Sequence, residues 1–180
     1  GIKDKWTNED FYQLGYAYYS EKKYDSAIDQ FNKIINQSNS LSQNAFYHLG
    51  DCYLKEEKKI EALSAFKKAS EMNFNKKIKE DALLQYAKLG FEIGNPFESY
   101  TNVLIRFLNN YPKNKYSEKI KSLLVLSYTN GGDYDSAIKI LESANPFKDE
   151  VTLQKVLYLK ALELYRNGLY IDAQTFLSNS

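Results

Sequence analysis

Histidine and cysteine, the side chains that are most informative about nucleophilic catalysis and zinc binding, occur once each in this sequence. His48 is the only histidine and Cys52 the only cysteine of the 180 residues. A catalytic triad or a zinc site would need further partners around them, and the sequence alone places none there. A single cysteine also forms no disulfide within the chain. We interpret His48 as a polar residue of a helix surface or groove, and Cys52 as a buried, inert thiol.

Other patterns that carry chemistry are also missing. The pair Gly131-Gly132 fits a turn between two helices better than a phosphate-binding loop, which needs a longer glycine pattern. We therefore expect no catalytic residue, no metal ion and no cofactor, and we predict that the chain is not an enzyme.

The charge balance narrows the class of partner. The chain has 24 lysines and arginines against 23 acidic residues, for a net charge of +1, and only Arg106 and Arg166 are arginines. A nucleic-acid binder is normally clearly basic and uses arginine to grip phosphate and guanine, so we expect no nucleic-acid partner. No apolar run approaches the roughly 18 residues that span a bilayer, so we expect no direct membrane insertion.

The helices that position these residues are predicted by a repeated pattern. An aromatic residue, a Leu-Gly pair and a tyrosine are followed by alanine, phenylalanine and a further apolar residue, and the whole set recurs 35 residues later. The first set is Phe11, Leu14, Gly15, Tyr18, Ala27, Phe31 and Ile34, and the second is Phe46, Leu49, Gly50, Tyr53, Ala62, Phe66 and Ala69.

This pattern resembles the tetratricopeptide repeat, in which each repeat is a pair of helices. The resemblance implies an all-α fold, a right-handed superhelical solenoid of about ten antiparallel helices. We predict a single domain over residues 1–180. Its repeats are expected at approximately 8–41, 43–76, 80–113, 118–151 and 154–180. Because the chain opens at Gly1 without a methionine and stops in mid-pattern, we expect it to be a piece of a longer protein.

Small residues are expected where the two helices of a repeat approach closely. Gly15 and Gly50 should face Ala27 and Ala62 across these contacts. In the third repeat the same alignment places Tyr100 at the small-residue position. We expect that repeat to splay or shift there, because a large ring replaces a methyl group.

The resemblance also implies which residues would line a concave peptide-binding groove on the first helix of each repeat. The expected groove residues are Glu9, Tyr12, Gln13, Tyr16, Tyr19, Asn44, Tyr47, His48, Asp51, Gln85 and Lys88. Tyrosines suit recognition, because each offers a flat apolar ring and a hydroxyl at low entropic cost. The alternative is that these rings only cover neighbouring helices. The lysine and asparagine clamp by which one subclass grips a terminal carboxylate is absent, since Tyr12, Tyr16 and His48 stand at its positions.

We predict a protein–protein interaction scaffold that binds a peptide or helix of a partner in this groove. The alternative is a structural module that self-associates within a larger multi-repeat protein. The stretch from Tyr111 to Glu118 resembles the tyrosine-proline links of tetratricopeptide proteins of the bacterial cell envelope. That resemblance favours the periplasm or envelope over the cytoplasm.

Overall fold

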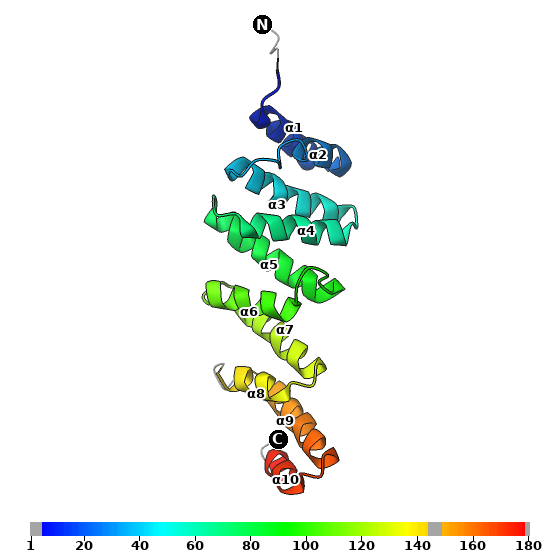
Figure 1. Ribbon diagram of the computed structural model, residues 1–180, viewed down its shortest axis with the longest axis vertical. Coiled ribbons are helices and arrows are strands. Elements are labelled where there is room, and N and C mark those ends of the chain that lie inside the picture. Colours follow the sequence, from blue (N-terminus) through cyan, green and yellow to red (C-terminus); the bar gives the residue numbers. More distant parts are fainter. Residues whose placement is uncertain (1–4, 144–148, 179–180) are drawn as a thin grey trace. The chain divides into compact units, whose positions relative to one another are not determined.

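The computed structural model describes residues 5–143 and 149–178, and every regular element in them is an α-helix, which confirms the all-α prediction (Figure 1). Ala144, which the repeat pattern predicts to be a packing residue of the fourth repeat, lies outside the described residues. The ten helices of the described chain are α1 (Asn8–Ser20), α2 (Tyr24–Phe31), α3 (Ser40–Lys55), α4 (Lys59–Glu71), α5 (Lys76–Ile93), α6 (Tyr100–Asn110), α7 (Ser117–Asn130), α8 (Tyr134–Ser143), α9 (Glu150–Arg166) and α10 (Tyr170–Ser178).

The chain divides into two compact units, Gly1–Tyr111 and Pro112–Ser180. In the first unit, α1 packs on α2, α2 on α3, α3 on α4, α4 on α5 and α5 on α6. Contacts also join α1 to α3 and α3 to α5, so these three helices share one face, which we call the α1–α3–α5 face. In the second unit, α7 packs on α8, α8 on α9 and α9 on α10. The expectation of one continuous domain over residues 1–180 stays a prediction.

Four helical hairpins end their first helix with the same turn. One residue of each turn has a positive φ, and the next residue donates its backbone N–H to a carbonyl five residues earlier, as in a Schellman motif. In the α1–α2 turn the positive φ is 61° at Lys22, and in the α3–α4 turn it is 58° at Glu57. Gly132 and Gly168, both at 78°, hold the same place in the α7–α8 and α9–α10 turns. The donor–carbonyl pairs are Lys23 to Tyr18 (2.9 Å), Lys58 to Tyr53 (2.8 Å), Asp133 to Tyr128 (2.9 Å) and Leu169 to Leu164 (3.0 Å).

The α5–α6 hairpin has a longer connection, and it corrects the sequence alignment. Val103, not Tyr100, occupies the small-residue position, because it is the fourth residue of α6 and is fully buried. Ala27 and Ala62 are likewise the fourth residues of α2 and α4. Tyr100 begins the helix, as Tyr24 begins α2. The third repeat therefore does not accommodate a ring in its close contact.

The longer connection is held by side chains. Arg106 donates two hydrogen bonds of 2.9 Å to the two carboxylate oxygens of Glu98, and the Tyr86 hydroxyl donates to the same carboxylate at 3.0 Å. These bonds fix the segment before α6 against α5 and α6. The arginine also lowers the pKa of the Glu98 carboxyl.

The close contacts inside the first two repeats also differ from the expected glycine–alanine pairing. A Cβ atom added at Gly15 would lie 2.9 Å from the ring of Phe31, and one added at Gly50 would lie 2.5 Å from the ring of Phe66. Ala27 and Ala62 are fully buried, but the phenylalanine one turn later lies over each glycine. Glycine is required because a ring, not a backbone, needs the space.

Candidate functional site

The side chain of His48 lies among five aromatic rings on the α1–α3–α5 face. Tyr12, Tyr16 and Tyr19 recur on α1 at spacings of four and three residues, which places them on one side of that helix. Their rings meet His48 on the neighbouring helix α3. The centroid distances from His48 are 6.1 Å to Tyr12, 5.4 Å to Tyr16, 5.3 Å to Tyr19, 5.5 Å to Phe31 and 5.9 Å to Tyr47. We call these six residues the aromatic cluster.

The aromatic cluster extends from the core to the surface. The Phe31 ring is fully buried and lies nearly parallel to the imidazole, at 15° between the ring planes. Tyr12, Tyr19, Tyr47 and His48 are partly buried. Tyr16 is 46% exposed and stacks on Tyr12 with the centroids 6.4 Å apart. The partly buried rings of Tyr12, Tyr19 and His48 therefore pack against Tyr16, of which 46% stays exposed.

The imidazole of His48 behaves here as a neutral aromatic ring. Its Nδ1 atom is buried and has no hydrogen-bond partner among the described residues. Burial lowers the pKa of His48 below its ordinary value of 6.5, because the charged form would lose its hydration. The neighbouring Cys52 is fully buried, as expected, and burial followed by the charges of Asp51 and Glu56 raises the pKa of its thiol to about 12. A thiolate at neutral pH is therefore not available to this histidine.

A carboxylate borders the aromatic cluster. Burial raises the pKa of Asp51 to about 6, and the ammonium of Lys55 one turn later opposes that rise. Tyr47 has a pKa of about 12, first because of burial and then because Asp51 and Asp81 are close to its hydroxyl. Burial and then Asp51 also raise the pKa of Tyr19. Asp51 thus adjoins tyrosines of both α1 and α3, and Asp81 brings α5 to the same surface.

The remaining predicted groove residues lie on the same three helices, α1, α3 and α5. Glu9 and Gln13 are exposed on α1, and Asn44 is partly buried near the start of α3. Gln85 and Lys88 are partly buried on α5. The structure therefore brings Tyr12, Tyr16, Tyr19, Tyr47, His48 and Asp51 together. The role of all eleven residues in binding stays a prediction.

Phe31 was not predicted to belong to the site. In the sequence pattern it is a core residue of the second helix, and nothing in the spacing shows that a core ring stacks on a groove histidine. The second repeat also has a phenylalanine at this position, but it does not predict the stacking. Its ring, that of Phe66, contacts Tyr47 instead, with the centroids 5.8 Å apart.

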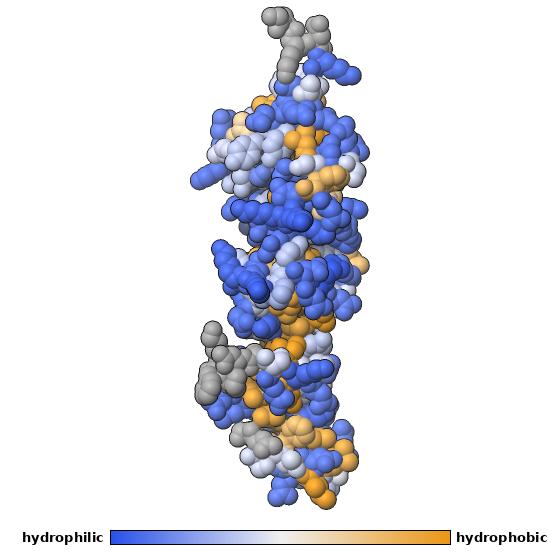
Figure 2. Space-filling model, turned by 90° about the vertical axis from the view of Figure 1, so that its left-hand side faces the viewer, coloured by the Kyte–Doolittle hydropathy of each residue, from blue (hydrophilic) through white to orange (hydrophobic). Residues whose placement is uncertain are grey.

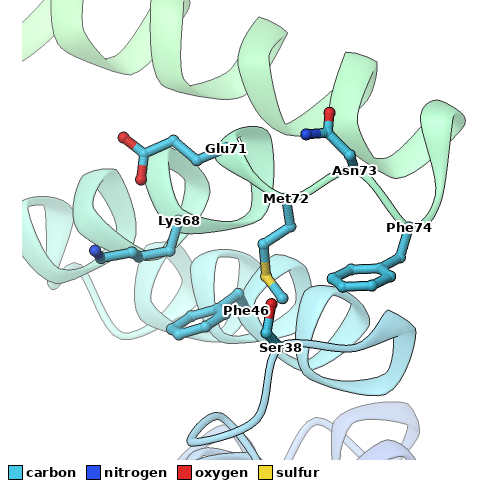
Figure 3. Close-up of a pocket in the computed structure, with 7 residues that line it drawn as sticks. All are labelled: Ser38, Phe46, Lys68, Glu71, Met72, Asn73 and Phe74. Atoms are coloured by element: carbon cyan, nitrogen blue, oxygen red, sulfur yellow. The ribbon is translucent and has the colours of Figure 1, made fainter.

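Two cavities of the first unit lie elsewhere and share Phe46. A cavity of about 360 Å³ is formed where α4 leads into α5 (Figure 3). There the Met72 side chain points toward Phe46 and Ser38, with the Phe74 ring alongside, while Lys68 and Glu71 point away (Figure 3). The second cavity, of about 460 Å³, is mainly apolar and includes Ile35, Phe46, Tyr53 and Phe97. None of the predicted groove residues lines either cavity, so neither supports the groove.

The described residues contain no group of three or more His, Cys, Asp or Glu side chains placed to hold a metal ion. Among the described helices, none has the length and apolar character needed to cross a bilayer.

Comparisons with known proteins agree with the helical repeat. Residues 2–69 match the family model described as anaphase-promoting complex, cyclosome, subunit 3. No curated protein matches the sequence. Several solved structures share the fold at low sequence identity.

One of these structures is MamA, which is 18% identical and aligns over 95% of this chain and 88% of its own, with a TM-score of 0.56. Another is YrrB, described as a TPR protein with an unusual peptide-binding site, at 15% identity, 96% and 84% coverage and a TM-score of 0.59. A third is a putative kinesin light chain of Podosopora anserina with nearly identical TPR-like repeats, at 13% identity, 95% and 91% coverage and a TM-score of 0.50. The resemblance to cell-envelope proteins stays a prediction. By its repeat pattern and its helical structure, this chain has a tetratricopeptide-type helical repeat fold.

Proposed function

We propose that this protein is an interaction scaffold whose α1–α3–α5 face binds a peptide or helix of a partner protein. The tetratricopeptide fold supports protein–protein interaction in general, and YrrB is a member described by its peptide-binding site. The observation that carries the proposal is the aromatic cluster, in which buried rings hold the half-exposed Tyr16 and the partly buried Tyr12, Tyr19 and Tyr47.

Preorganised tyrosines are effective anchors for binding. Their rings supply apolar contact area, their hydroxyls bond a peptide backbone, and little side-chain freedom is lost when the rings are already packed. On the face drawn in Figure 2, hydrophilic side chains cover most of the first unit and apolar ones show in separate patches. We therefore expect a few aromatic anchors to supply most of the binding energy, rather than a broad apolar surface.

The test starts from a partner recovered by affinity capture and then purified. Its dissociation constant is measured against the wild-type chain and against a Tyr12→Ala, Tyr16→Ala, Tyr47→Ala variant. Loss of central anchors should weaken binding by about thirtyfold or more, corresponding to about 2 kcal/mol. Circular dichroism must show that the variant is folded, because Tyr12 and Tyr47 also contact the core rings Phe31 and Phe66.

A matched control is available in the second unit. Tyr165 is 61% exposed and lies on α9, outside the aromatic cluster. Tyr165→Ala removes an exposed tyrosine of the same kind and should leave the affinity unchanged. Undiminished binding by the folded triple variant would rule out the α1–α3–α5 face as the binding surface.

A second candidate function is self-assembly. Apolar side chains are exposed on the last helical hairpin, where Tyr170 is 62% and Ile171 is 82% exposed. Such residues suit contact with another repeat or another copy of the chain. Light scattering of the purified chain decides between the two, since a self-assembling module forms oligomers at micromolar concentration and a simple scaffold stays a monomer.

A further inference from the structure

Asp51 is a carboxylate with no salt-bridge or hydrogen-bond partner among the described residues. It is partly buried, yet it forms no salt bridge with any described residue. Lys55 is the nearby cation, but it is exposed and its charge only partly offsets the burial. Placing an ionised carboxylate in a partly dehydrated position is costly unless a cation or hydrogen-bond donor compensates. A cationic group of a partner would supply that compensation.

The aromatic rings next to Asp51 favour the same sign of charge. The face of a tyrosine ring attracts a cation, with a gain of about 0.5–2 kcal/mol according to how dry the site is. Tyr16 and Tyr19 present two rings with centroids 6.1 Å apart and planes inclined by 33°. The neutral ring of His48 lies behind both of them and adds no positive charge. Asp81, near Tyr47, adds a second negative charge on the side of α5.

We infer that the aromatic cluster and Asp51 together bind an arginine side chain of the partner. This assignment rests on the proposed function and specifies the chemistry of the bound segment. The guanidinium group stacks on the exposed face of Tyr16 and Tyr19 while its N–H groups donate to the carboxylate of Asp51. Arginine fits better than lysine, because its planar, weakly hydrated group both stacks on rings and bonds a carboxylate with two parallel hydrogen bonds.

The same arrangement of carboxylates disfavours an acidic ligand. An acidic segment, or a terminal carboxylate, would approach Asp51 and Asp81 and meet repulsion at a position where the dielectric is low. Lys55, one turn after Asp51, offsets only part of the effect of burial on that carboxylate. The surface therefore selects a basic residue.

The test uses defined probes and the whole chain. The pentapeptide acetyl-Ala-Ala-Arg-Ala-Ala-amide is titrated into ¹⁵N-labelled protein, and the same peptide with citrulline in place of arginine serves as the neutral control of equal shape. We expect saturable chemical-shift changes at Tyr16, Tyr19 and Asp51 with a dissociation constant of about 1 mM, since a single side chain is bound. The citrulline peptide should produce no saturable change, and a lysine peptide should bind more weakly than the arginine peptide.

Two variants of the protein complete the test. Asp51→Asn removes the charge with little change of shape and should weaken binding of the arginine peptide by about tenfold. Asp25→Asn removes an acidic charge on α2, where Asp25 pairs with Lys58 at 3.2 Å, and should leave the affinity unchanged.

The outcomes separate this inference from the proposed function. Equal binding of the arginine and citrulline peptides, unchanged affinity in Asp51→Asn, or tighter binding of the lysine peptide would each overturn the assignment of arginine. If the arginine peptide does not bind but the triple tyrosine variant still loses the purified partner, the inference falls and the proposed function stands. If the peptide binds at Asp51 while that variant retains the partner, the proposed function falls instead.

Discussion

The backbone N–H of Asn75 donates a hydrogen bond of 2.7 Å to the side-chain oxygen of Gln43, which reaches it from another helix. The amide nitrogen of Gln43 donates in turn to the carbonyls of Ala69 at 3.0 Å and Met72 at 2.9 Å. Gln43 is fully buried on α3, whereas Asn75 caps the start of α5. One side chain thus satisfies the end of α4 and the residue that begins α5.

Replacing Gln43 should therefore destabilise the first unit strongly. Gln43→Leu keeps a similar volume but removes the hydrogen bonds of three buried or partly buried backbone groups, which should lower the free energy of unfolding by about 2–4 kcal/mol. Urea unfolding measures the change, and Gln13→Leu on the exposed side of α1 is the control. A midpoint shift no larger than that of the control would show that water replaces the amide without cost.

The hairpin turns predict a stabilising substitution. Glu57 has a left-handed backbone at φ 58°, which costs a side-chain-bearing residue about 1–2 kcal/mol relative to glycine. Replacing Glu57 by glycine would remove this cost, but the greater chain entropy of glycine in the unfolded state offsets part of the stabilisation. Glu57→Gly should raise the free energy of unfolding by about 0.5–1 kcal/mol. Gly132→Ala, at φ 78° in the equivalent turn of α7–α8, should lower it by a similar amount, and the same sign for both would contradict the explanation.

The close packing of the helix pairs predicts that substitutions at Ala62 and at Lys59, both on α4, differ in their effect on stability. Ala62 is fully buried on α4, so Ala62→Leu forces extra methylene groups into a filled space and should cost about 1–3 kcal/mol or more. Lys59 begins the same helix on the surface, where it pairs with Glu92 at 2.6 Å. Lys59→Ala should change stability by less than about 1 kcal/mol, because exposed ion pairs contribute little. Equal melting temperatures of wild type and Ala62→Leu would contradict the helix pairing.

The pKa of Asp51 predicts how stability depends on pH. Its folded pKa is raised from 3.8 to about 6, so the folded state binds more protons than the unfolded state between these values. Stability therefore falls as pH rises through this window, and the cost is complete above pH 6. Asp51→Asn should be more stable than wild type by about 1–2 kcal/mol at pH 7.5, after allowance for partial exposure. The difference should vanish near pH 4, and His48 cancels from it because both proteins carry that residue.

Protonation of Asp51 should also change the affinity for the arginine peptide. Below pH 6, Asp51 becomes neutral and loses its attraction for the guanidinium, so affinity should fall by about tenfold between pH 7.5 and pH 5. The groups facing Asp51 do not reverse this trend. Tyr19 from α1 and Tyr47 and Cys52 from α3 have raised pKa values and stay neutral over this range. Protonation of His48 would act in the same direction. Affinity that is flat over this range in the titration would contradict the role of Asp51.

Much of the first unit was predictable from the sequence because its first two repeats have the same spacing. Seven positions that recur after 35 residues place the same faces of α1 and α3 against their partners. The third repeat was misaligned because Gly94, which follows α5, indicates a turn but does not determine how long the connection is. A β-branched Val103 also stands where the earlier repeats have alanine.

The candidate site was predictable only in part. The spacing of Tyr12, Tyr16 and Tyr19 indicates one helix face, and the alignment of the two glycines places His48 opposite them. The stacking of His48 on Phe31 depends on which rotamers fill the space over Gly15, and a sequence pattern does not contain that information. The exposed fraction of each ring follows from the same packing.

The hydrogen bonds that hold the segment before α6 have a consequence for exchanging repeats between proteins. Glu98 lies in the connection, Arg106 in α6 and Tyr86 in α5, so the three partners are spread over the whole hairpin. A junction placed inside the connection would separate the carboxylate from its donors and leave an arginine and a buried hydroxyl unpaired. Residues 76–110 must therefore be transplanted as one cassette, whereas the hairpins with short turns tolerate a junction at the turn itself.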